Sequence, residues 1–297
     1  MQKILIVGSG DVARRILSRL MLHARCCRVF ALLRDAGRRA GWRAAGAVPL
    51  LADLDERASL SRLAGVADVL VHLAPPPGQG ESDTRTRHLL AALSKAASLP
   101  RCLIYVSTTG VYGDCAGAVI DETRRLNPES PRAGRRVDAE RRVRDWGARQ
   151  GVRVCIIRAP GIYAADRLPL DRLQNALPAL VDRDDVFTNH IHADDLAAAC
   201  LAAIRHGRAN RTYNAVDDSV LKMGDYFDQV ADAFALPRPP RLARDALRAV
   251  VSPMQWSFMR ESRRIGNQRL KNELKLRLAY PTIAAGLADA RSRRNVC

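Results

Sequence analysis

Two glycines near the start of the chain have the spacing with which a backbone turn can hold phosphate groups. The segment Gly8-Ser9-Gly10-Asp11-Val12-Ala13 fits the pattern G-x-G-x-x-G/A and directly follows the apolar run 3–7. In this pattern the first glycine permits a tight turn, the second lets the backbone approach a pyrophosphate, and the small last residue lets a helix pack closely on the strand. The N–H groups at the start of that helix attract phosphate oxygens. We therefore expect this turn to bind a dinucleotide, the alternative being an ordinary strand-to-helix turn without a ligand.

The end of the second apolar run indicates which dinucleotide the turn would take. This run ends in Leu32-Leu33-Arg34-Asp35. A carboxylate at this place holds the ribose hydroxyls of NAD, whereas an arginine accommodates the 2′-phosphate of NADP. A hydrogen bond to a charged group is worth roughly 1.5 to 3 kcal/mol, which is about a tenfold to hundredfold preference. We expect NADP as the cofactor. In the alternative, Asp35 binds the ribose of NAD and Arg34 points to solvent.

Strands and helices have to hold these residues, and the first half of the chain alternates short apolar runs with helical stretches. Such alternation is typical of parallel strands with helices on both faces of the sheet. The expected strands are 3–7, 28–33, 47–51, 68–73, 101–106 and 153–157, and the expected helices are 11–23, 55–63, 84–98 and 137–150. The sequence thus predicts an α/β fold with a doubly wound parallel sheet, the Rossmann arrangement.

The second half of the chain is less regular, because prolines interrupt shorter helical pieces beyond about residue 160. Two elements remain clear. Asp194 is expected to cap a helix over 195–206 that ends at Gly207, and 211–216 is expected to form a further strand. We predict a dinucleotide-binding domain over 1–160, to which 187–216 returns, and a smaller substrate-binding lobe made of 161–186 and 217–297.

Further motifs follow the later strands in a recognisable order. They are Ala52-Asp53-Leu54, His72-Leu73-Ala74-Pro75-Pro76, the run Tyr105-Val106-Ser107-Thr108-Thr109-Gly110-Val111-Tyr112-Gly113, the run Arg158-Ala159-Pro160-Gly161-Ile162-Tyr163, and His190-Ile191-His192-Ala193-Asp194-Asp195-Leu196. Together with the glycine turn, these segments resemble the extended short-chain dehydrogenase/reductase family, the NAD(P)-dependent epimerase/dehydratase group. The resemblance spans nearly the whole chain. It implies oxidoreductase or epimerase chemistry with a bound nicotinamide cofactor.

The resemblance also implies a role for residues in each motif. Implied cofactor contacts are Asp53 and Leu54 near the adenine, Ala74, Pro75 and Pro76 along the cleft, and Ser107, Pro160, Gly161 and Ile162 at the nicotinamide end. Thr108 matches the family's catalytic Ser/Thr, which hydrogen-bonds the substrate oxygen. On the substrate side the implied residues are Tyr112, Tyr163, Arg167, His190 and His192, with Arg167 on an anionic group. Each of the two histidines could instead be a structural hydrogen-bonding residue.

One motif departs from the family pattern. The family has Y-x-x-x-K at the start of the helix after the fifth strand, where this chain has Arg132 and Arg136. A phenol can give up its proton, whereas an arginine effectively never does, so Arg132 cannot replace the tyrosine as an acid. Arg136 could still bind the nicotinamide ribose, and Arg132 could hold a carbonyl or carboxylate as a fixed cation.

Two interpretations follow from this departure. In the first, the chain is an enzyme with another proton donor, for which the candidates are Thr108, Tyr112, Tyr163 and His190. In the second, it binds NADP without turnover, as a regulator or interaction protein. We favour an enzyme that acts on a small anionic metabolite or a nucleotide sugar, because Arg132, Arg158 and Arg167 are expected to converge near the cleft.

Composition limits the partners. The formal net charge of +17 attracts anions without specifying one. An aromatic content of 5%, with no run that interleaves aromatics and arginines, argues against a nucleic-acid groove without excluding one. No metal site is expected, since the seven cysteines form no C-x-x-C pair. No apolar run approaches the roughly 20 residues of a membrane helix, and no signal segment precedes the first strand. We expect a cytoplasmic protein with a small-molecule substrate and no membrane partner, and leave a homodimer open.

Overall fold

The computed structural model describes residues 1–22 and 27–294. The expected helix end at His23 and the last residues of the expected second lobe, 295–297, lie outside the described residues. The strands are β1 (Gln2–Val7), β2 (Cys27–Leu33), β3 (Val48–Leu51), β4 (Val69–His72), β5 (Cys102–Thr108), β6 (Val119–Ile120), β7 (Arg153–Ala159), β8 (Gly161–Tyr163), β9 (Ala179–Leu180), β10 (Phe187–Thr188), β11 (His190–His192), β12 (Arg211–Asn214), β13 (Leu221–Lys222), β14 (Arg241–Leu242) and β15 (Arg264–Ile265). The helices are α1 (Asp11–Met21), α2 (Arg39–Ala44), α3 (Thr84–Leu93), α4 (Pro131–Gln150), α5 (Leu170–Gln174), α6 (Ala193–His206), α7 (Met223–Ala233), α8 (Arg244–Val250), α9 (Pro253–Met259), α10 (Gln268–Glu273) and α11 (Ile283–Arg294).

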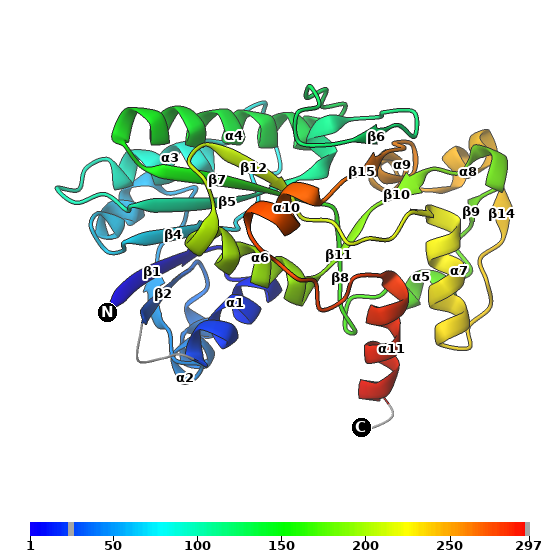
Figure 1. Ribbon diagram of the computed structural model, residues 1–297, viewed down its shortest axis with the longest axis horizontal. Helices are drawn as coiled ribbons and strands as arrows, with labels where there is room; N and C mark the ends of the chain where they lie inside the picture. The colour runs from blue at the N-terminus through cyan, green and yellow to red at the C-terminus, as the bar shows by residue number, and fades with distance from the viewer. Residues whose placement is uncertain (23–26, 295–297) are drawn as a thin grey trace.

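Seven strands form one parallel sheet in the order β12-β7-β5-β4-β1-β2-β3 (Figure 1). Apolar side chains fill both faces of the central strands β1, β4 and β5, as a sheet covered on both sides requires. The predicted fold class, a doubly wound parallel sheet, is therefore confirmed. The strand order reverses between β1 and β4, and such sheets bind ligands at the carboxyl ends of the strands at this point.

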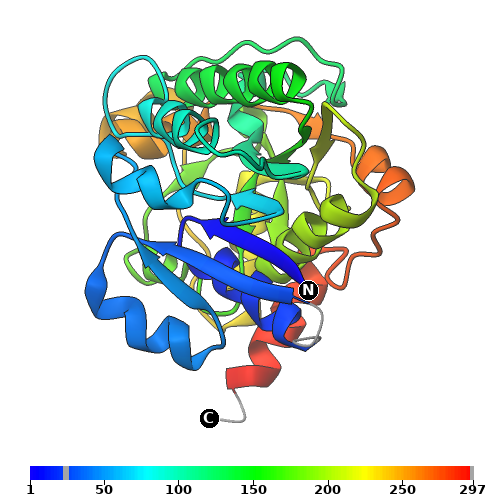
Figure 2. The same cartoon turned by 90° about the vertical axis from the view of Figure 1, so that its left-hand side faces the viewer.

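Helices cover both faces of the sheet, as Figure 2 shows. Alternate residues of β1 point to opposite sides: Ile4 and Ile6 join one apolar cluster, with α1 and α6, while Leu5 and Val7 join a second, with α3 and α4. The sheet is thus fixed from two sides, and the loops at its carboxyl edge are held by buried strands.

Several helix boundaries differ from those expected. Residues 57–63 form a 3-10 helix, and a short helical segment that was not expected, 36–44, connects β2 to β3. Helix α3 ends at Leu93, before the expected residue 98. Helix α4 begins six residues earlier than expected because Pro131 suits the first helical position and Ser130 Oγ accepts a hydrogen bond from Ala133 N (3.2 Å). Ser130 and Pro131 lie in a polar stretch, so apolar periodicity could not predict that α4 begins there.

Helix α6 was expected to be capped by Asp194, and this expectation was wrong. The helix begins at Ala193, and His192 is its cap, with Nδ1 accepting a hydrogen bond from Asp194 N at 3.2 Å. The imidazole can do this because it carries an acceptor nitrogen in its neutral form. Gly207 ends the helix as expected.

A smaller lobe lies beyond the carboxyl edge of the sheet, at the right of Figure 1. Its own apolar cluster joins α5, α7, α8, α9 and α11, with Leu173, Phe227, Val230, Leu247 and Leu287 among its buried members. Strand β12 lies beside β7 at the edge of the main sheet. Within residues 1–22 and 27–294, every helix is too short or too polar to cross a membrane.

Candidate active site

The carboxyl ends of β1 to β4 surround a cavity of about 370 Å³. It lies where the strand order of the sheet reverses, the place at which this fold takes dinucleotides. Its lining residues are Gly8, Ser9, Leu32, Arg34, Asp35, Arg38, Ala52, Asp53, Leu54, Ala74, Pro75 and Arg85. The structure thus brings together residues from the glycine turn and from the motifs after β2, β3 and β4.

The glycine turn is packed closely on one side and leaves space on the other. Gly8 has a φ of 98°, and a Cβ there would lie 2.5 Å from the backbone nitrogen of Ala74. A Cβ on Gly10 would meet nothing within 4 Å. Gly10 also precedes α1 without a side chain that caps the first N–H groups of the helix. This geometry fits a pyrophosphate, which needs close backbone approach and free N–H donors.

Two arginines line the same cavity near the end of β2. Arg34 is exposed, and Arg38 donates hydrogen bonds from Nη1 to Ser9 Oγ (3.2 Å) and from Nη2 to the Ser9 carbonyl (2.6 Å). The Asp35 carboxylate, the alternative ribose ligand, accepts a hydrogen bond from Gly37 N (2.8 Å) and caps the turn at 36–38. Sequence reasoning missed Arg38 because the helical segment that presents it was not expected.

A second cavity, of about 310 Å³, lies between the carboxyl ends of β5 and β7 and the smaller lobe. Large apolar side chains line much of it, namely Phe187, Met223, Tyr226, Phe227, Phe258 and Met259. Charged side chains in the lining are Arg132, Arg172, Glu261 and Arg263. The remaining lining residues are Thr108, Thr109, Gly110, Ser130, Ala133, Pro160, Gly161, Thr188, Asn189, His190, Gln255 and Ser257.

The second cavity contains Thr108, Arg132 and His190 of the predicted site residues, together with Pro160 and Gly161. Thr108 is the last residue of β5, and its Oγ1 accepts a hydrogen bond from Gly110 N at 3.2 Å. Arg132 lies in the first turn of α4, where its guanidinium carbon is 4.4 Å from the centre of the Phe258 ring. Side chains of the sheet, of α4 and of the smaller lobe therefore share one chamber.

Arg136 lies one turn further along α4 and bonds the ends of two strands. Its Nη1 donates to Tyr105 Oη (3.0 Å) and to the carbonyl of Val106 (2.9 Å), and lies 3.5 Å from the carbonyl of Ala74. Ala74 lines the first cavity, so Arg136 reaches the boundary of the dinucleotide cleft. Beside it, Ser107 Oγ is buried without a hydrogen-bond partner among the described residues.

The structure places two tyrosines predicted on the substrate side, Tyr112 and Tyr163, away from the second cavity. Tyr112 Oη donates to Asn214 Oδ1 (2.7 Å) and accepts from Arg158 Nη1 (2.9 Å). Tyr163 is buried in the core of the smaller lobe, and its Oη donates to the carbonyl of Thr282 (3.3 Å). Neither residue belongs to the lining of the second cavity. Both are buried by long-range partners that the local motif does not reveal.

The expected convergence of three arginines at the cleft was also wrong. Arg158 is buried and forms two hydrogen bonds to Glu140, at 3.0 and 2.7 Å. Arg167 Nη1 lies 3.4 Å from Asp11 Oδ2, beside the glycine turn. Of the three, Arg132 alone is in the lining of the second cavity. The other two are drawn to buried or neighbouring carboxylates.

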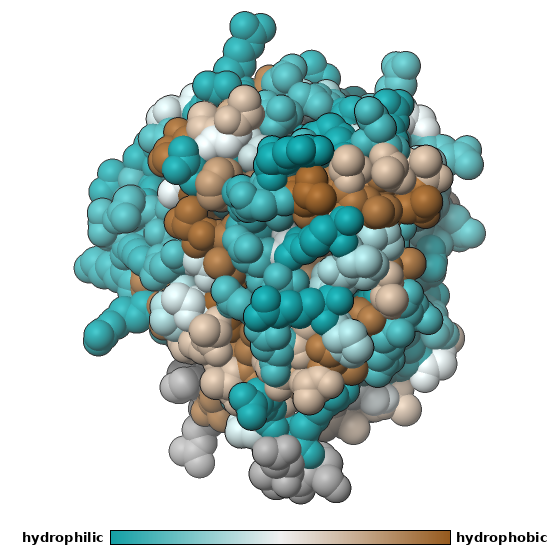
Figure 3. All heavy atoms as spheres, turned by 90° about the vertical axis from the view of Figure 1, so that its right-hand side faces the viewer, coloured by the Kyte–Doolittle hydropathy of each residue, from teal (hydrophilic) through white to brown (hydrophobic). Residues whose placement is uncertain are grey.

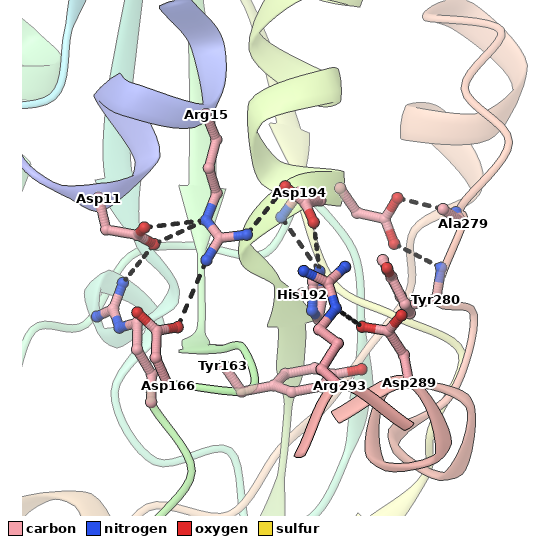
Figure 4. A network of polar contacts seen from close by, with 12 residues as sticks. Asp11, Arg15, Tyr163, Asp166, His192, Asp194, Ala279, Tyr280, Asp289 and Arg293 are labelled. Carbon is pink, nitrogen blue, oxygen red and sulfur yellow. Dashed lines mark hydrogen bonds and ion pairs between the residues drawn. The ribbon is translucent and has the colours of Figure 1, made fainter. Parts of the chain in front are cut away.

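His192 belongs to a polar network around the starts of α1 and α6 (Figure 4), and Arg167 joins it through Asp11. Arg15 bonds Asp11 Oδ2 (2.9 Å) and Asp194 Oδ1 (3.0 Å), and thereby ties α1 to α6. His192 stacks on Tyr280, with ring centres 3.8 Å apart. The cations beside Asp11 offset the repulsion that its carboxylate would exert on a bound pyrophosphate.

The other predicted cofactor residues lie outside both cavity linings. Val12 and Ile162 pack against the apolar cluster under α1 and α6, and the carbonyl of Pro76 lies 3.4 Å from Arg85 Nη1. Their side chains support the loops at the edge of the sheet. A contact to the cofactor from these residues remains a prediction.

His190 and Tyr226 form a pair on the wall of the second cavity. Their ring centres lie 4.1 Å apart and the ring planes are tilted by 32°. Burial lowers the pKa of His190 to about 3, so its imidazole is neutral at physiological pH. Tyr226 comes from α7 and was missed in the sequence, because a tyrosine in an amphipathic helix reads as a core residue.

The chain matches the model of one protein family and is similar to several known proteins. The model of the NAD dependent epimerase/dehydratase family matches residues 4–215. The chain is 28% identical over 211 residues to the GDP-6-deoxy-D-mannose reductase of Pseudomonas aeruginosa, which covers 62% of this chain and 69% of that protein. It is 28% identical over 236 residues to the 4-hydroxy-2-methyl-3-oxo-4-farnesyl-3,4-dihydroquinoline-1-oxide ketoreductase of Stigmatella aurantiaca, covering 74% and 69%.

Solved structures give the same result for the fold. A conserved protein of unknown function from Silicibacter pomeroyi is 30% identical and superposes with a TM-score of 0.82 over 99% of both chains. The UDP-glucose 4-epimerase of Thermotoga maritima superposes with a TM-score of 0.78 over 99% of this chain and 100% of that one, at 16% identity. At 16% identity, the similarity to the T. maritima epimerase shows only that the two proteins share a fold.

Proposed function

Because this chain belongs to the NAD dependent epimerase/dehydratase family, whose model matches residues 4–215, we propose that it is an NADP-dependent oxidoreductase or epimerase acting on a small anionic substrate. Membership of the family supports NAD(P)-dependent chemistry of the oxidoreductase and epimerase type. The choice of NADP, the substrate class and the altered proton donor are the parts proposed here.

The observation that carries the choice of cofactor is the pair Arg34 and Arg38 beside the glycine turn. Both line the cavity that contains Gly8 and Asp53, and Arg38 is held in place by two hydrogen bonds to Ser9. A 2′-phosphate beside these guanidinium groups would accept charge-assisted hydrogen bonds. Asp35 uses its carboxylate to cap the next turn, which leaves it less able to hold the ribose of NAD.

The second cavity supports an anionic substrate with an apolar part. Of its arginines, Arg263 pairs with Glu261 at 2.6 Å, and Arg172 bonds the carbonyl of Pro178. Arg132 has no hydrogen bond or ion pair among the described residues, so its charge is available to a ligand. Phenylalanine and methionine side chains opposite it favour an apolar group. A nucleotide sugar is the alternative, because the reductase from P. aeruginosa is named for one.

In this proposal each half of the site has its own task. The bound cofactor supplies or accepts a hydride at the substrate carbon. Thr108 Oγ1 donates a hydrogen bond to the substrate oxygen, Arg132 holds the anionic group, and Arg136 fixes the ends of β4 and β5 between the two cavities. The apolar lining excludes water and strengthens these interactions.

Paired calorimetric titrations with NADPH and NADH test the cofactor. We expect NADPH to bind about tenfold to a hundredfold more tightly, and this preference to fall in Arg34→Ala and Arg38→Ala. Arg43→Ala, an exposed arginine of α2, is the matched control. An equal affinity for both dinucleotides would contradict the choice of NADP, and absence of binding would contradict the enzyme.

Reductase turnover is tested by the loss of NADPH absorbance with phenylpyruvate and other aromatic and aliphatic keto acids. Epimerisation of UDP-glucose consumes no net NADPH and is followed separately, by identifying the sugar product. Oxidation of NADPH by keto acids supports the proposal. Tight NADPH binding without turnover of any of these compounds would instead favour a non-enzymatic NADP-binding regulator, a role consistent with arginine at positions 132 and 136.

A further inference from the structure

We infer that Tyr226, supplied by the smaller lobe, is the proton donor of this site. The inference rests on the proposed function, since it assigns a residue to the reaction proposed there. Helix α4 offers arginines at 132 and 136, and an arginine does not act as an acid at physiological pH. Another side chain must then give a proton to the substrate oxygen.

The tyrosines of the chain separate into two groups by what their hydroxyls contact. Five are engaged away from the second cavity: Tyr105 with Arg136, Tyr112 with Asn214 and Arg158, Tyr163 with Thr282, Tyr213 with Arg208 and Glu273, and Tyr280 with Arg293. Tyr226 is the sixth. It lines the second cavity, and no hydrogen bond among residues 1–22 and 27–294 uses its hydroxyl.

The ring of Tyr226 is buried, whereas its hydroxyl stays accessible. The residue is only 7% exposed, and its ring packs in the core of the smaller lobe with Phe227 and Val230. Unlike Ser107 Oγ and His190 Nδ1, the Tyr226 Oη is not enclosed by the described residues, and Tyr226 lines the second cavity. A substrate oxygen in this cavity could therefore accept a hydrogen bond from the hydroxyl without displacing a protein partner.

The surroundings of Tyr226 hold its ring in one orientation. His190 stacks on the Tyr226 ring. The backbone of Gly161 lies close to the His190 ring, since a Cβ on Gly161 would lie 3.2 Å from His190 Cδ2, and this contact limits the movement of His190. Strands β8 and β11 set this contact, since Gly161 and His190 are partners in their parallel ladder. His190 Nδ1 is buried without a partner among the described residues. His190 therefore acts as a positioning residue for the phenol.

Thr108 and Tyr226 approach the cavity from different parts of the fold. Thr108 ends β5 of the main sheet, and Tyr226 lies on α7 of the smaller lobe. Burial raises the pKa of Tyr226 above its ordinary value, so the phenol is protonated throughout the physiological range. The protonated phenol can donate its proton when a carbonyl is reduced, and little phenolate is present to act as a base.

The proposed step balances as a carbonyl reduction. The carbonyl carbon gains the hydride that NADPH supplies, the electron pair of the C=O π bond moves to oxygen, and that oxygen takes the proton from Tyr226 Oη. The products are the alcohol, the oxidised cofactor and a phenolate, which recovers its proton from water. Thr108 contributes a hydrogen bond to the same oxygen and keeps its own proton.

The test compares Tyr226→Phe with Tyr213→Phe, using NADPH and phenylpyruvate or whichever keto acid the wild-type protein reduces. We expect Tyr226→Phe to lower kcat at least 100-fold while the NADPH dissociation constant stays within threefold. Its melting temperature should not fall, because the hydroxyl has no protein partner to lose. Tyr213→Phe removes a buried hydroxyl that bonds Arg208 N and Glu273, so it should lower the melting temperature and leave kcat within threefold.

The possible results separate this inference from the proposed function. If the wild-type protein reduces a keto acid and Tyr226→Phe retains more than a third of its kcat, the assignment of Tyr226 is wrong and the proposed function stands. If Tyr226→Phe loses activity and melting temperature together, Tyr226 is a structural residue, and the assignment is again overturned. If the wild-type protein epimerises UDP-glucose but reduces no keto acid, the carbonyl reduction assigned to Tyr226 falls and the proposed function stands. If it does neither, both proposals fall.

Discussion

The cavity at the glycine turn, which we propose for the dinucleotide, and the second cavity, which we propose for the substrate, are built in different ways. The parts of the molecule that form them are called the dinucleotide half and the substrate half. The first cavity is made by short loops that directly follow β1 to β4, and its closest fit is between two backbones, at Gly8 and Ala74. The second cavity is made by side chains from segments far apart in the chain, from Thr108 to Arg263. One half therefore depends on backbone shape, and the other depends on side chains that come together only in the folded chain.

The surfaces of the two halves differ as well. The face of the smaller lobe shows apolar side chains among polar ones (Figure 3). Helices α8 and α9 carry exposed Val250, Met254 and Phe258, and Phe258 also lines the second cavity. Large apolar side chains are therefore present both inside the second cavity and on the helices beside it, and three arginines line each of the two cavities.

The largest effect is expected from the buried ion pair between α4 and β7. Glu140→Gln would leave Arg158 buried beside a neutral partner, and breaking such a pair costs about 3 to 5 kcal/mol of unfolding free energy. Urea denaturation measures this loss. If the two halves are as separate as described, NADPH should still bind the folded fraction with an affinity within threefold of the wild type.

Glu129→Gln is the control for Glu140→Gln, since Glu129 pairs with Arg260 near the surface and such pairs contribute about 0 to 1 kcal/mol. A loss of NADPH affinity in Glu140→Gln beyond tenfold would show that the halves are coupled and would undo the comparison.

The next effect tests the backbone of the dinucleotide half. Gly8→Ala would place a Cβ 2.5 Å from Ala74 N at a φ of 98°, and we expect it to lower the unfolding free energy by about 3 kcal/mol. Gly10→Ala is the matched control, because nothing lies within 4 Å of its Cβ position. This control should fold with nearly wild-type stability and bind NADPH at least tenfold more weakly. Equal stabilities of the two variants would contradict the close packing described here.

The same contrast explains how much the sequence could predict. The fold class, the glycine turn and the motifs after β2, β3 and β4 are local patterns that follow strands, and sequence reasoning identified them. Tyr112 and Tyr163 belong to motifs too, but their hydroxyls are taken by Asn214 and Thr282, which lie far along the chain. Tyr226 belongs to no motif. Side-chain partners of this kind follow from tertiary packing, which a local pattern does not encode.

Asp217 provides a pH test that concerns the substrate half alone. Its backbone N–H donates to the carbonyl of His190 (2.7 Å), and burial raises the pKa of its carboxyl to about 7. A folded-state pKa above the ordinary value means that the folded protein binds the proton more tightly than the unfolded chain does. Stability is therefore highest below about pH 4 for this group and declines as the pH rises to about 7.

We expect this decline to amount to about 2 kcal/mol between pH 5 and pH 8, measured by urea denaturation at several pH values. Asp217→Asn cannot ionise and should flatten the profile. Asp245→Asn, which alters an exposed carboxylate of α8 that does not act on Asp217, should leave the profile as in the wild type. A wild-type profile that rises over this range would exclude a protonated Asp217 in the folded state.

The smallest effect concerns Arg132, the arginine of the second cavity whose side chain has neither a hydrogen bond nor an ion pair among the described residues. Arg132→Met keeps the length of the side chain and its contact with Phe258 but removes the cation. We expect KM for phenylpyruvate to rise about tenfold, or about 1.4 kcal/mol, with kcat changed less, because the guanidinium binds the carboxylate before and after the chemical step. Arg149→Met, at the other end of α4, should leave both constants unchanged. An unchanged KM in Arg132→Met would mean that the second cavity recognises the shape of its substrate and not its charge. The cationic recognition of anions would then be confined to the dinucleotide cleft.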